Sequence, residues 1–401
     1  AIPALRVDPD VAAQWEPGLT STEYDFGLRK PAEKRGLIAG MSMTEKQGGS
    51  DVRTNTTVAE PVADGYLLTG HKWFCSAPMS DLFLVLAQAP GGLTCFVVPR
   101  VLPDGSRNVF EIQRLKEKLG NRSNASSEIE FDGTRAQRLG DEGRGVRTIV
   151  EMISATRLDC VLGSTGLMRR AVSEAIWHAS HREAFGARLI DQPLMRQVLA
   201  DLALEVEAAQ WLGLRLAHAV DASESAEQGA LRRIALPMSK YYVCKRAPGL
   251  TFEAMECLGG PGYVEETGLP RLYREAPVNS IWEGSGNVNA LDLLRAMARS
   301  PESLDAYLQA LAPAAGCDPA FDEQLSDVLN ALAAGATEGR ARWLAERMVL
   351  LLQTALLVQH APAFVSDAFI TARLRQNEGT YGVVDLAAQD VEAILERARP
   401  A

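Results

Sequence analysis

The sequence predicts an α+β fold in which a small antiparallel β-barrel precedes a bundle of helices. Residues 37–147 contain short runs that alternate between apolar and polar side chains, which is typical of strands with one buried face. From residue 148 onward, apolar side chains recur every three or four positions, which is typical of amphipathic helices. Residues 1–36 are rich in Pro, Asp and short polar residues, and we expect an irregular linker or the end of a missing segment.

Turn signals divide the first region into strands. Asp64-Gly65 and Pro90-Gly91-Gly92 each lie between two apolar runs and predict hairpins. The predicted strands are Val58–Val62, Tyr66–Phe74, Phe83–Ala89, Leu93–Val98, Val109–Gln113 and Ser127–Phe131. Short strands at this spacing predict a barrel or sandwich domain at residues 37–147.

Helical periodicity fills the rest of the chain. The predicted helices cover roughly residues 148–180, 193–220, 228–258, 286–299 and 341–358. In the second helix an apolar stripe is formed by Leu194, Val198, Leu202 and Val206. Pro-containing segments at 312–319 and 361–363 separate the helices of the last region. We therefore predict a helical bundle at 148–299 and an additional C-terminal helical domain at 300–401.

Composition narrows the class of protein. The 401 residues are 47% hydrophobic and 23% charged, the balance of an ordinary globular protein, with a net charge of −10. That charge disfavours binding to nucleic acid or to an anionic membrane, and no apolar run is long enough to span a bilayer. The six cysteines are scattered without zinc spacing, so we expect reduced, buried thiols in a cytoplasmic protein, with no metal site.

The segment Ile281–Asn287 contains the first candidate for a catalytic residue. Glu283 stands between two bulky apolar residues and a Gly-Ser-Gly turn. A carboxylate beside apolar neighbours loses water, so its proton affinity rises and it becomes a competent base near neutral pH. Alternatively, Glu283 is a first-turn residue that interacts favourably with a helix dipole. Arg157, in a mostly apolar helix, needs a carboxylate or the loop around Glu283 as its partner if it is buried.

Further segments have two interpretations each. The paired glycines and Ser50 of Met41–Asp51 suit a pyrophosphate or a flavin edge, or form a polar loop between strands. The aromatic residues of His71–Ala77 form a wall for a flat heterocycle, or belong to the core. Leu258–Tyr263 is a helix cap or a close approach to a ligand, and His181–Gly186 is a ligand contact or an exposed helix end.

These segments carry a family resemblance. MTEKQGGSD, GHKWFCSA, KLGNRSNASSEIEFDG, HREAFG, LGGPGY and SIWEGSGN occur in an order and spacing that resemble the acyl-CoA dehydrogenase flavoproteins, closest to the AidB-like branch. The likeness covers about residues 35–299 and, more loosely, the tail. It implies an acyl-CoA dehydrogenase-like fold with FAD bound between the barrel and the helical bundle. The N-terminal helical domain of relatives is largely missing, so we expect a truncated or processed chain in which residues 1–36 are a remnant of that domain.

The resemblance also assigns residues to the cofactor. Bordering the flavin and its phosphates would be Met41, Met43, Thr44, Gly49 and Ser50. Phe74 and Ser76 would cover the isoalloxazine, while Ile281, Ser285 and Asn287 would meet the cofactor near Glu283. A neighbouring subunit's FAD would be contacted by Arg182, Phe185, Gln192, Gly259 and Gly260, which implies a homodimer or homotetramer. Phe74 stands where many relatives have Trp, and Glu256 where many have Gln, which puts the affinity for FAD in doubt.

The implied activity is dehydrogenation of a short or branched acyl-CoA. Glu283 would remove the α-proton, and the β-hydrogen would leave as hydride to the flavin, which passes electrons to an electron-transfer flavoprotein. Some relatives place the base next to Arg157, but here that position is Thr156, which cannot act as one. The oxyanion would be met by the backbone amide of Glu283 and a flavin ribityl hydroxyl.

Two alternatives remain open. The AidB likeness suggests a DNA-binding or alkylation-protective role with weak dehydrogenase activity, which requires clustered basic residues. Residues 301–401 contain seven Arg and no Lys against fourteen acidic residues, a net charge of −7. A basic patch could still form from Arg340, Arg342, Arg347, Arg373 and Arg375, but the sequence favours a solvated helix face and contacts within a tetramer for these residues. The third possibility is a flavin-bound interaction scaffold with little turnover.

Overall fold

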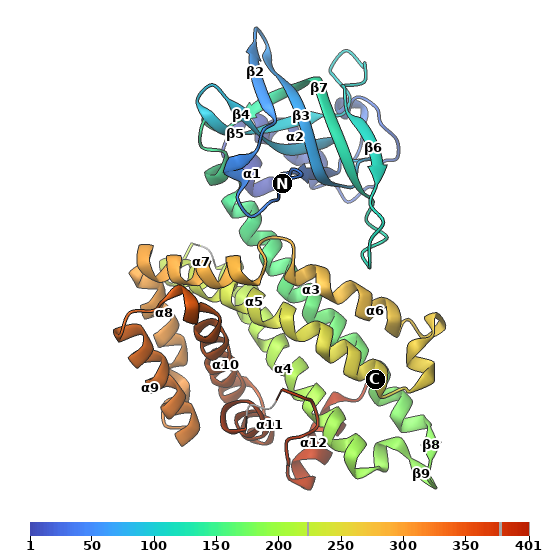
Figure 1. Ribbon diagram of the computed structural model, residues 1–401, viewed down its shortest axis with the longest axis vertical. Helices are drawn as coiled ribbons and strands as arrows, with labels where there is room; N and C mark the ends of the chain where they lie inside the picture. The colour runs from blue at the N-terminus through green and yellow to red at the C-terminus, as the bar shows by residue number, and fades with distance from the viewer. Residues whose placement is uncertain (223, 377–378, 401) are drawn as a thin grey trace. The chain divides into compact units, whose positions relative to one another are not determined.

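The computed structural model describes residues 1–222, 224–376 and 379–400 (Figure 1). The chain divides into two compact units, residues 1–155 and 156–401, which are treated separately below. The helices after residue 300 share the core of the second unit. The boundaries that the sequence suggested near residues 147 and 299 stay predictions.

The first unit opens with helices, so of the two alternatives for its start the irregular linker was wrong for residues 2–5 and 9–19, and the remnant of a helical segment stays a prediction. Helix α1 spans Ile2–Leu5 and α2 spans Pro9–Leu19. Asp8 caps α2, since its carboxylate accepts hydrogen bonds from the amides of Asp10 and Val11, and Pro9 occupies the first turn. Residues on both helices, among them Leu5 and Trp15, are buried against strand residues of the barrel.

The barrel is a closed ring of strands. In chain order the strands are β1 (Ala39–Ser42), β2 (Val58–Val62), β3 (Gly65–Ser76), β4 (Leu82–Ala89), β5 (Gly92–Pro99), β6 (Glu111–Leu115) and β7 (Ser126–Leu139). The ring runs β4-β2-β3-β7-β5 and returns to β4, with β1 on β4 and β6 on β7 (Figure 1). Both predicted hairpins, β2–β3 and β4–β5, are antiparallel pairs, so these predictions are confirmed.

Side-chain alternation along β4 gives the barrel two apolar layers. Leu82, Leu84 and Leu86 join the cluster that packs against α1 and α2. The intervening Phe83 and Val85 join the second cluster with aromatic residues of β5 and β7. Because successive residues of a strand face opposite sides, a strand buried on both faces is apolar on both, as β4 is from Leu82 to Ala87.

The second unit is helical apart from the short β8–β9 hairpin (Glu183–Ala184 and Ala187–Arg188) in the described residues (Figure 1). The longer helices are α3 (Gly145–His181, which begins in the first unit), α4 (Pro193–Asp221), α5 (Ala226–Glu256), α7 (Gly286–Arg299), α8 (Pro301–Leu311), α9 (Pro319–Ala333), α10 (Ala341–His360) and α12 (Ala388–Ala398). Shorter are α6 (Leu269–Glu275) and α11 (Ala363–Phe369), which continues as a π-helix over Ile370–Arg375. All five helices predicted from periodicity are present.

A buried ionic network joins the C-terminal segment to the bundle. Arg373 of the π-helix donates to Asp201 at 2.6 Å and to Glu205 at 3.0 Å, both on α4. Arg246 of α5 also donates to Glu205. Burial alone would raise the pKa of Glu205, but the charges of the two arginines hold it below its usual range.

Two details of the sequence predictions were wrong. Leu194, placed in the apolar stripe of α4, is 83% exposed, whereas Leu202 and Val206 are buried. All six cysteines lie in the described part of the chain and none is paired, but Cys317 is exposed while the other five are buried. Among the described helices, none is long and apolar enough to cross a lipid bilayer.

Candidate active site

Glu283 lies on the loop that joins the 3₁₀ helix Ala276–Ser280 to α7. Its carboxylate accepts a hydrogen bond of 2.7 Å from the hydroxyl of Thr156 on α3. The residue is partly buried, and burial raises the pKa of this carboxyl, while the Thr156 hydrogen bond and the charges of Lys240 and Arg157 oppose the rise. A carboxyl whose pKa is raised and which still ionises is suited to accept a proton near neutral pH.

The backbone around Glu283 is held by two cations. Lys240 of α5 donates to the carbonyls of Trp282 at 2.5 Å and Gly284 at 2.6 Å, and Arg157 of α3 donates to the carbonyl of Glu283 at 3.0 Å. Glu283 has a φ of +57°, a conformation that few residues other than glycine adopt. Three consecutive carbonyls are therefore fixed by donors, and they keep Glu283 in an otherwise unfavourable conformation.

Arg157 meets both kinds of partner that the sequence predicted. Its Nη1 pairs with Asp292 of α7 at 2.6 Å, in addition to its bond to the Glu283 carbonyl. Asp292 also pairs with Arg233 of α5 at 2.9 Å. Arg157 thus connects α3, the loop and α7, and it contacts the backbone of Glu283 rather than its carboxylate.

Sequence reasoning missed Lys240 and Asn289. Lys240 is only 1% exposed, in the middle of an apolar stretch of α5. Asn289 is buried and donates to the carbonyls of Gly284 and Ser285. The one available signal for Lys240 was its place among buried positions of the helical pattern, since lysine is almost never fully buried without a purpose.

In the first unit, the residues assigned to the flavin lie on β1, on the loop that follows it, and on β3. Met41 and Met43 pack partly buried against the cluster beneath α1 and α2. The carbonyl of Thr44 accepts a hydrogen bond of 2.8 Å from the amide of Trp73. There the register of β3 against β7 shifts, between Lys72 and Cys75. The loop after β1 and the aromatic segment of β3 are thus brought together.

The space around Gly49, the second of the two glycines in this loop, is limited by the side chain of Thr44. A Cβ on Gly49 would lie 2.4 Å from the Thr44 hydroxyl oxygen, so the backbone approaches Thr44 more closely than any other residue would allow. Ser50 beside it is exposed. On β3, Phe74 is 48% exposed and Ser76 is partly buried. The ammonium of Lys116 lies 4.6 Å from the centre of the Phe74 ring. The half-exposed ring and a hydroxyl two residues along the strand are groups that a flat heterocycle could contact.

A buried ion pair that the sequence did not reveal fixes the same loop. Glu45 and Lys72 are both fully buried and their side chains meet at 2.8 Å. Glu45 also accepts hydrogen bonds from the amides and hydroxyls of Thr56 and Thr57. Burial would raise the pKa of Glu45, but these donors and Lys72 hold it far below its usual range. The pair ties both ends of the loop to β3.

The residues assigned to a partner's cofactor are exposed in the second unit. Phe185 forms the tip of the β8–β9 hairpin, is 98% exposed and has a φ of +54°. Arg182, Gly259 and Gly260 are also exposed, and Gln192, partly buried, donates to the carbonyl of Ala184 in the hairpin. An exposed apolar side chain such as that of Phe185, on a backbone conformation that is unfavourable for non-glycine residues, is typical of a residue that contacts a binding partner.

The remaining assigned residues flank Glu283. Ile281 is 64% exposed and Ser285 is partly buried. The side-chain oxygen of Asn287 accepts a hydrogen bond of 2.7 Å from Arg342 of α10. The first turn of α7 is therefore in contact with the C-terminal helices.

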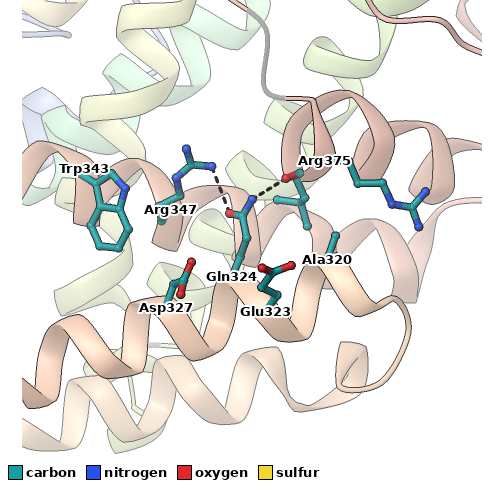
Figure 2. A pocket seen from close by; sticks show the side chains of 8 residues that line it. Ala320, Glu323, Gln324, Asp327, Trp343, Arg347 and Arg375 are labelled. Atoms are coloured by element: carbon teal, nitrogen blue, oxygen red, sulfur yellow. Dashed lines mark hydrogen bonds between the residues drawn. The ribbon is translucent and has the colours of Figure 1, made fainter.

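The structure removes one of the five arginines from the proposed basic patch. Arg373 is buried in the ionic network and cannot contribute to a surface. Arg347 and Arg375 line a cleft of about 520 Å³ between α9, α10 and the π-helix. Arg347 donates a hydrogen bond to Gln324, whereas the side chain of Arg375 points away from these two residues (Figure 2). Its other lining residues include Glu323 and Asp327, so the cleft carries both signs of charge. None of the residues assigned to FAD lines it.

Comparison with known proteins identifies the family. Residues 40–134 match the acyl-CoA dehydrogenase middle domain and residues 143–298 match the acyl-CoA dehydrogenase C-terminal domain. The chain therefore belongs to the acyl-CoA dehydrogenase family of oxidoreductases. It is 47% identical to the putative acyl-CoA dehydrogenase AidB of Escherichia coli over 98% of this chain and 72% of that protein. The resemblance inferred from the motifs, including the AidB-like branch, is confirmed.

More distant relatives share the fold as well. Acyl-CoA dehydrogenase family member 11 of Caenorhabditis elegans is 32% identical over 85% of this chain and 61% of its own length. The solved structure of Caenorhabditis elegans ACDH-11 in complex with C11-CoA superposes with a TM-score of 0.75 at 31% identity, covering 92% of this chain and 64% of that one. The predicted fold class, a strand barrel followed by helices, is confirmed.

Proposed function

We propose that this protein catalyses the FAD-dependent α,β-dehydrogenation of a short or branched acyl-CoA thioester to a trans-2-enoyl-CoA. The observation that carries the proposal is Glu283, a partly buried carboxyl with a raised pKa that is oriented by Thr156. Its carboxylate makes no ion pair with any described residue, although two cations lie nearby. It is therefore free to accept a proton.

The chain's own groups can perform the proton half of the reaction. The carboxylate of Glu283 takes the α-proton of the thioester, leaving an electron pair that forms the new C–C double bond. The developing negative charge falls on the thioester oxygen and needs a donor. Among the described residues the backbone amide of Glu283 finds no acceptor, so it is available for that oxygen.

The residues present also fit a flavin. FAD, when bound, accepts the β-hydrogen as hydride. The close approach of Gly49 to Thr44 leaves no room for a side chain, which suits a loop whose amides contact phosphate. Phe74 offers an exposed ring and Ser76 a hydroxyl for the isoalloxazine. These two would cover the ring, while Met41, Met43 and Ser50 would border the cofactor.

A second subunit is part of the proposal, as a homodimer or homotetramer. Phe185, Leu194 and Tyr263 are 98%, 83% and 80% exposed on the second unit, and burial in an interface would remove this apolar surface from water. Arg182, Gln192, Gly259 and Gly260 would join Phe185 at the cofactor of the neighbouring subunit. We propose an electron-transfer flavoprotein as the electron acceptor.

Replacement of the base tests the proposal. Glu283→Gln should keep the yellow colour and the FAD stoichiometry but lose anaerobic reduction by acyl-CoA. Glu253→Gln is the matched control, because Glu253 on α5 is partly buried, has a pKa that burial raises, and lies outside the loop. Undiminished bleaching of the Glu283→Gln flavin would refute the assignment.

A panel of thioesters tests the substrate. It should compare butyryl-, isovaleryl- and longer acyl-CoA, including the C11 chain bound by the worm relative. The proposal expects the fastest flavin reduction with the short or branched compounds. Faster reduction by the C11 thioester would overturn that part, and reduction by none of them would favour an interaction scaffold.

A further inference from the structure

Lys240 is a buried ammonium that makes no ion pair with any described residue. Its described hydrogen-bond partners are two backbone carbonyls, those of Trp282 and Gly284. Burial lowers the pKa of Lys240, and the nearby Glu283 is among the groups that oppose the shift. An ammonium removed from water is unfavourable unless its donors are used, so these two hydrogen bonds hold the side chain in place.

The two carbonyls lie on either side of Glu283. Donation to residues 282 and 284 by one nitrogen fixes the peptide units that flank Glu283, and Arg157 fixes the carbonyl of Glu283 itself. The loop would otherwise relax from the left-handed φ of +57°. Because Lys240 extends from α5 and Arg157 from α3, two helices determine the direction of one side chain.

We infer that Lys240 is a positioning residue for Glu283, holding the loop backbone so that the carboxylate meets Thr156 and the substrate proton. This inference rests on the proposed role of Glu283 as the base. It assigns Lys240 no contact with substrate or cofactor. Its charge also favours the ionised carboxylate, but it acts on the backbone rather than by pairing with the carboxylate.

A purely structural lysine would lower stability and speed amide exchange, so the test combines exchange in the loop with a readout that stability does not move, the position of the acid limb of the pH profile. Lys240→Met removes both hydrogen bonds, Lys240→Arg restores a cationic donor, and Lys245→Met is the control, because Lys245 is an exposed cation on the same helix. Hydrogen exchange of the intact protein is measured over residues 279–290. Amides of Ile281, Trp282 and Asn289 have backbone acceptors there and report on the loop.

The inference expects these amides to exchange at least tenfold faster in Lys240→Met, and at the original rate in Lys245→Met. The rate of flavin reduction should fall at least tenfold on the acid side of its pH profile, with KM for acyl-CoA little changed. The acid limb moves to higher pH because the positive charge of Lys240 lowers the pKa of Glu283. Lys240→Arg should recover both the protection and the position of the limb.

Unchanged exchange together with an unmoved acid limb in folded Lys240→Met would overturn the inference. If that variant does not fold, Lys240→Gln, which keeps a donor but loses the charge, must still move the limb. Glu283→Gln separates the two claims. Continued bleaching of that variant would defeat the proposed function, whereas the exchange data judge the positioning of the loop whatever the base is.

Discussion

Replacing Arg373 with Met should destabilise the second unit strongly. Its guanidinium, 4% exposed, is the partner of two carboxylates that are themselves 2% and 1% exposed, those of Asp201 and Glu205. Removing one member of a buried ion pair costs about 3–5 kcal/mol, because a charge is left without compensation. Glu205 keeps Arg246, and Asp201 keeps a hydrogen bond from the amide of Gly382, so we expect the lower end of that range.

The measurement is thermal unfolding of the whole protein at neutral pH, followed by circular dichroism. A loss of about 3 kcal/mol lowers the transition by roughly 6–12 °C for a unit of this size. Arg375→Met is the control, since Arg375 pairs with Asp318 at the surface and such pairs contribute about 1 kcal/mol or less. Equal shifts for the two variants would show that the buried network does not hold the C-terminal segment.

Two further predictions concern the site and the assembly. Thr156→Val removes the hydrogen bond to Glu283 and raises the pKa of Glu283 further. Flavin reduction should therefore slow about tenfold on the acid side of the pH profile and recover at higher pH. Thr165→Val, a change on the same helix, should leave the profile unchanged. In Phe185→Asn the asparagine can adopt the positive φ of residue 185, but the apolar surface is lost. Sedimentation should therefore show a dimer dissociation constant about a hundredfold higher. Phe26→Asn, which changes an exposed ring of the first unit, should leave the dissociation constant unchanged. An unmoved pH profile or unchanged association would contradict the respective prediction.

Periodicity predicted most of the helices and strands, because the burial of one face determines both the spacing of apolar residues in the sequence and the element that forms. The strands β4 and β5 contain long buried apolar runs, and the turns of both hairpins contain the glycines that hairpins require. The helices α4, α5 and α10 follow their apolar positions within a few residues. Helix α2 was missed although Asp8-Pro9 carries a recognisable N-terminal signature.

The arrangement of the candidate site was less accessible to sequence reasoning. The Ile281–Asn287 motif singled out Glu283, but Lys240 lies 43 positions before it on another helix, and helical periodicity does not reveal which residues of different helices meet. A lysine is ordinarily expected on the solvent face, so the only sign of its burial was its place among the apolar positions of α5. The sequence also did not reveal the ion pair of Lys72, because Lys72 lies on β3 and its partner Glu45 lies in the loop after β1.

The distribution of charges around Glu283 explains how this carboxyl can be partly buried between two cations without pairing with either of them. Had Lys240 or Arg157 paired with the carboxylate directly, its pKa would be lowered and it would be a poor proton acceptor. Both cations instead donate to carbonyl oxygens of the loop, and a neutral hydroxyl, that of Thr156, is the described group that contacts the carboxylate. The loop is therefore fixed by strong charge-assisted hydrogen bonds, while burial keeps the pKa of Glu283 raised, as the proposed role of this residue requires.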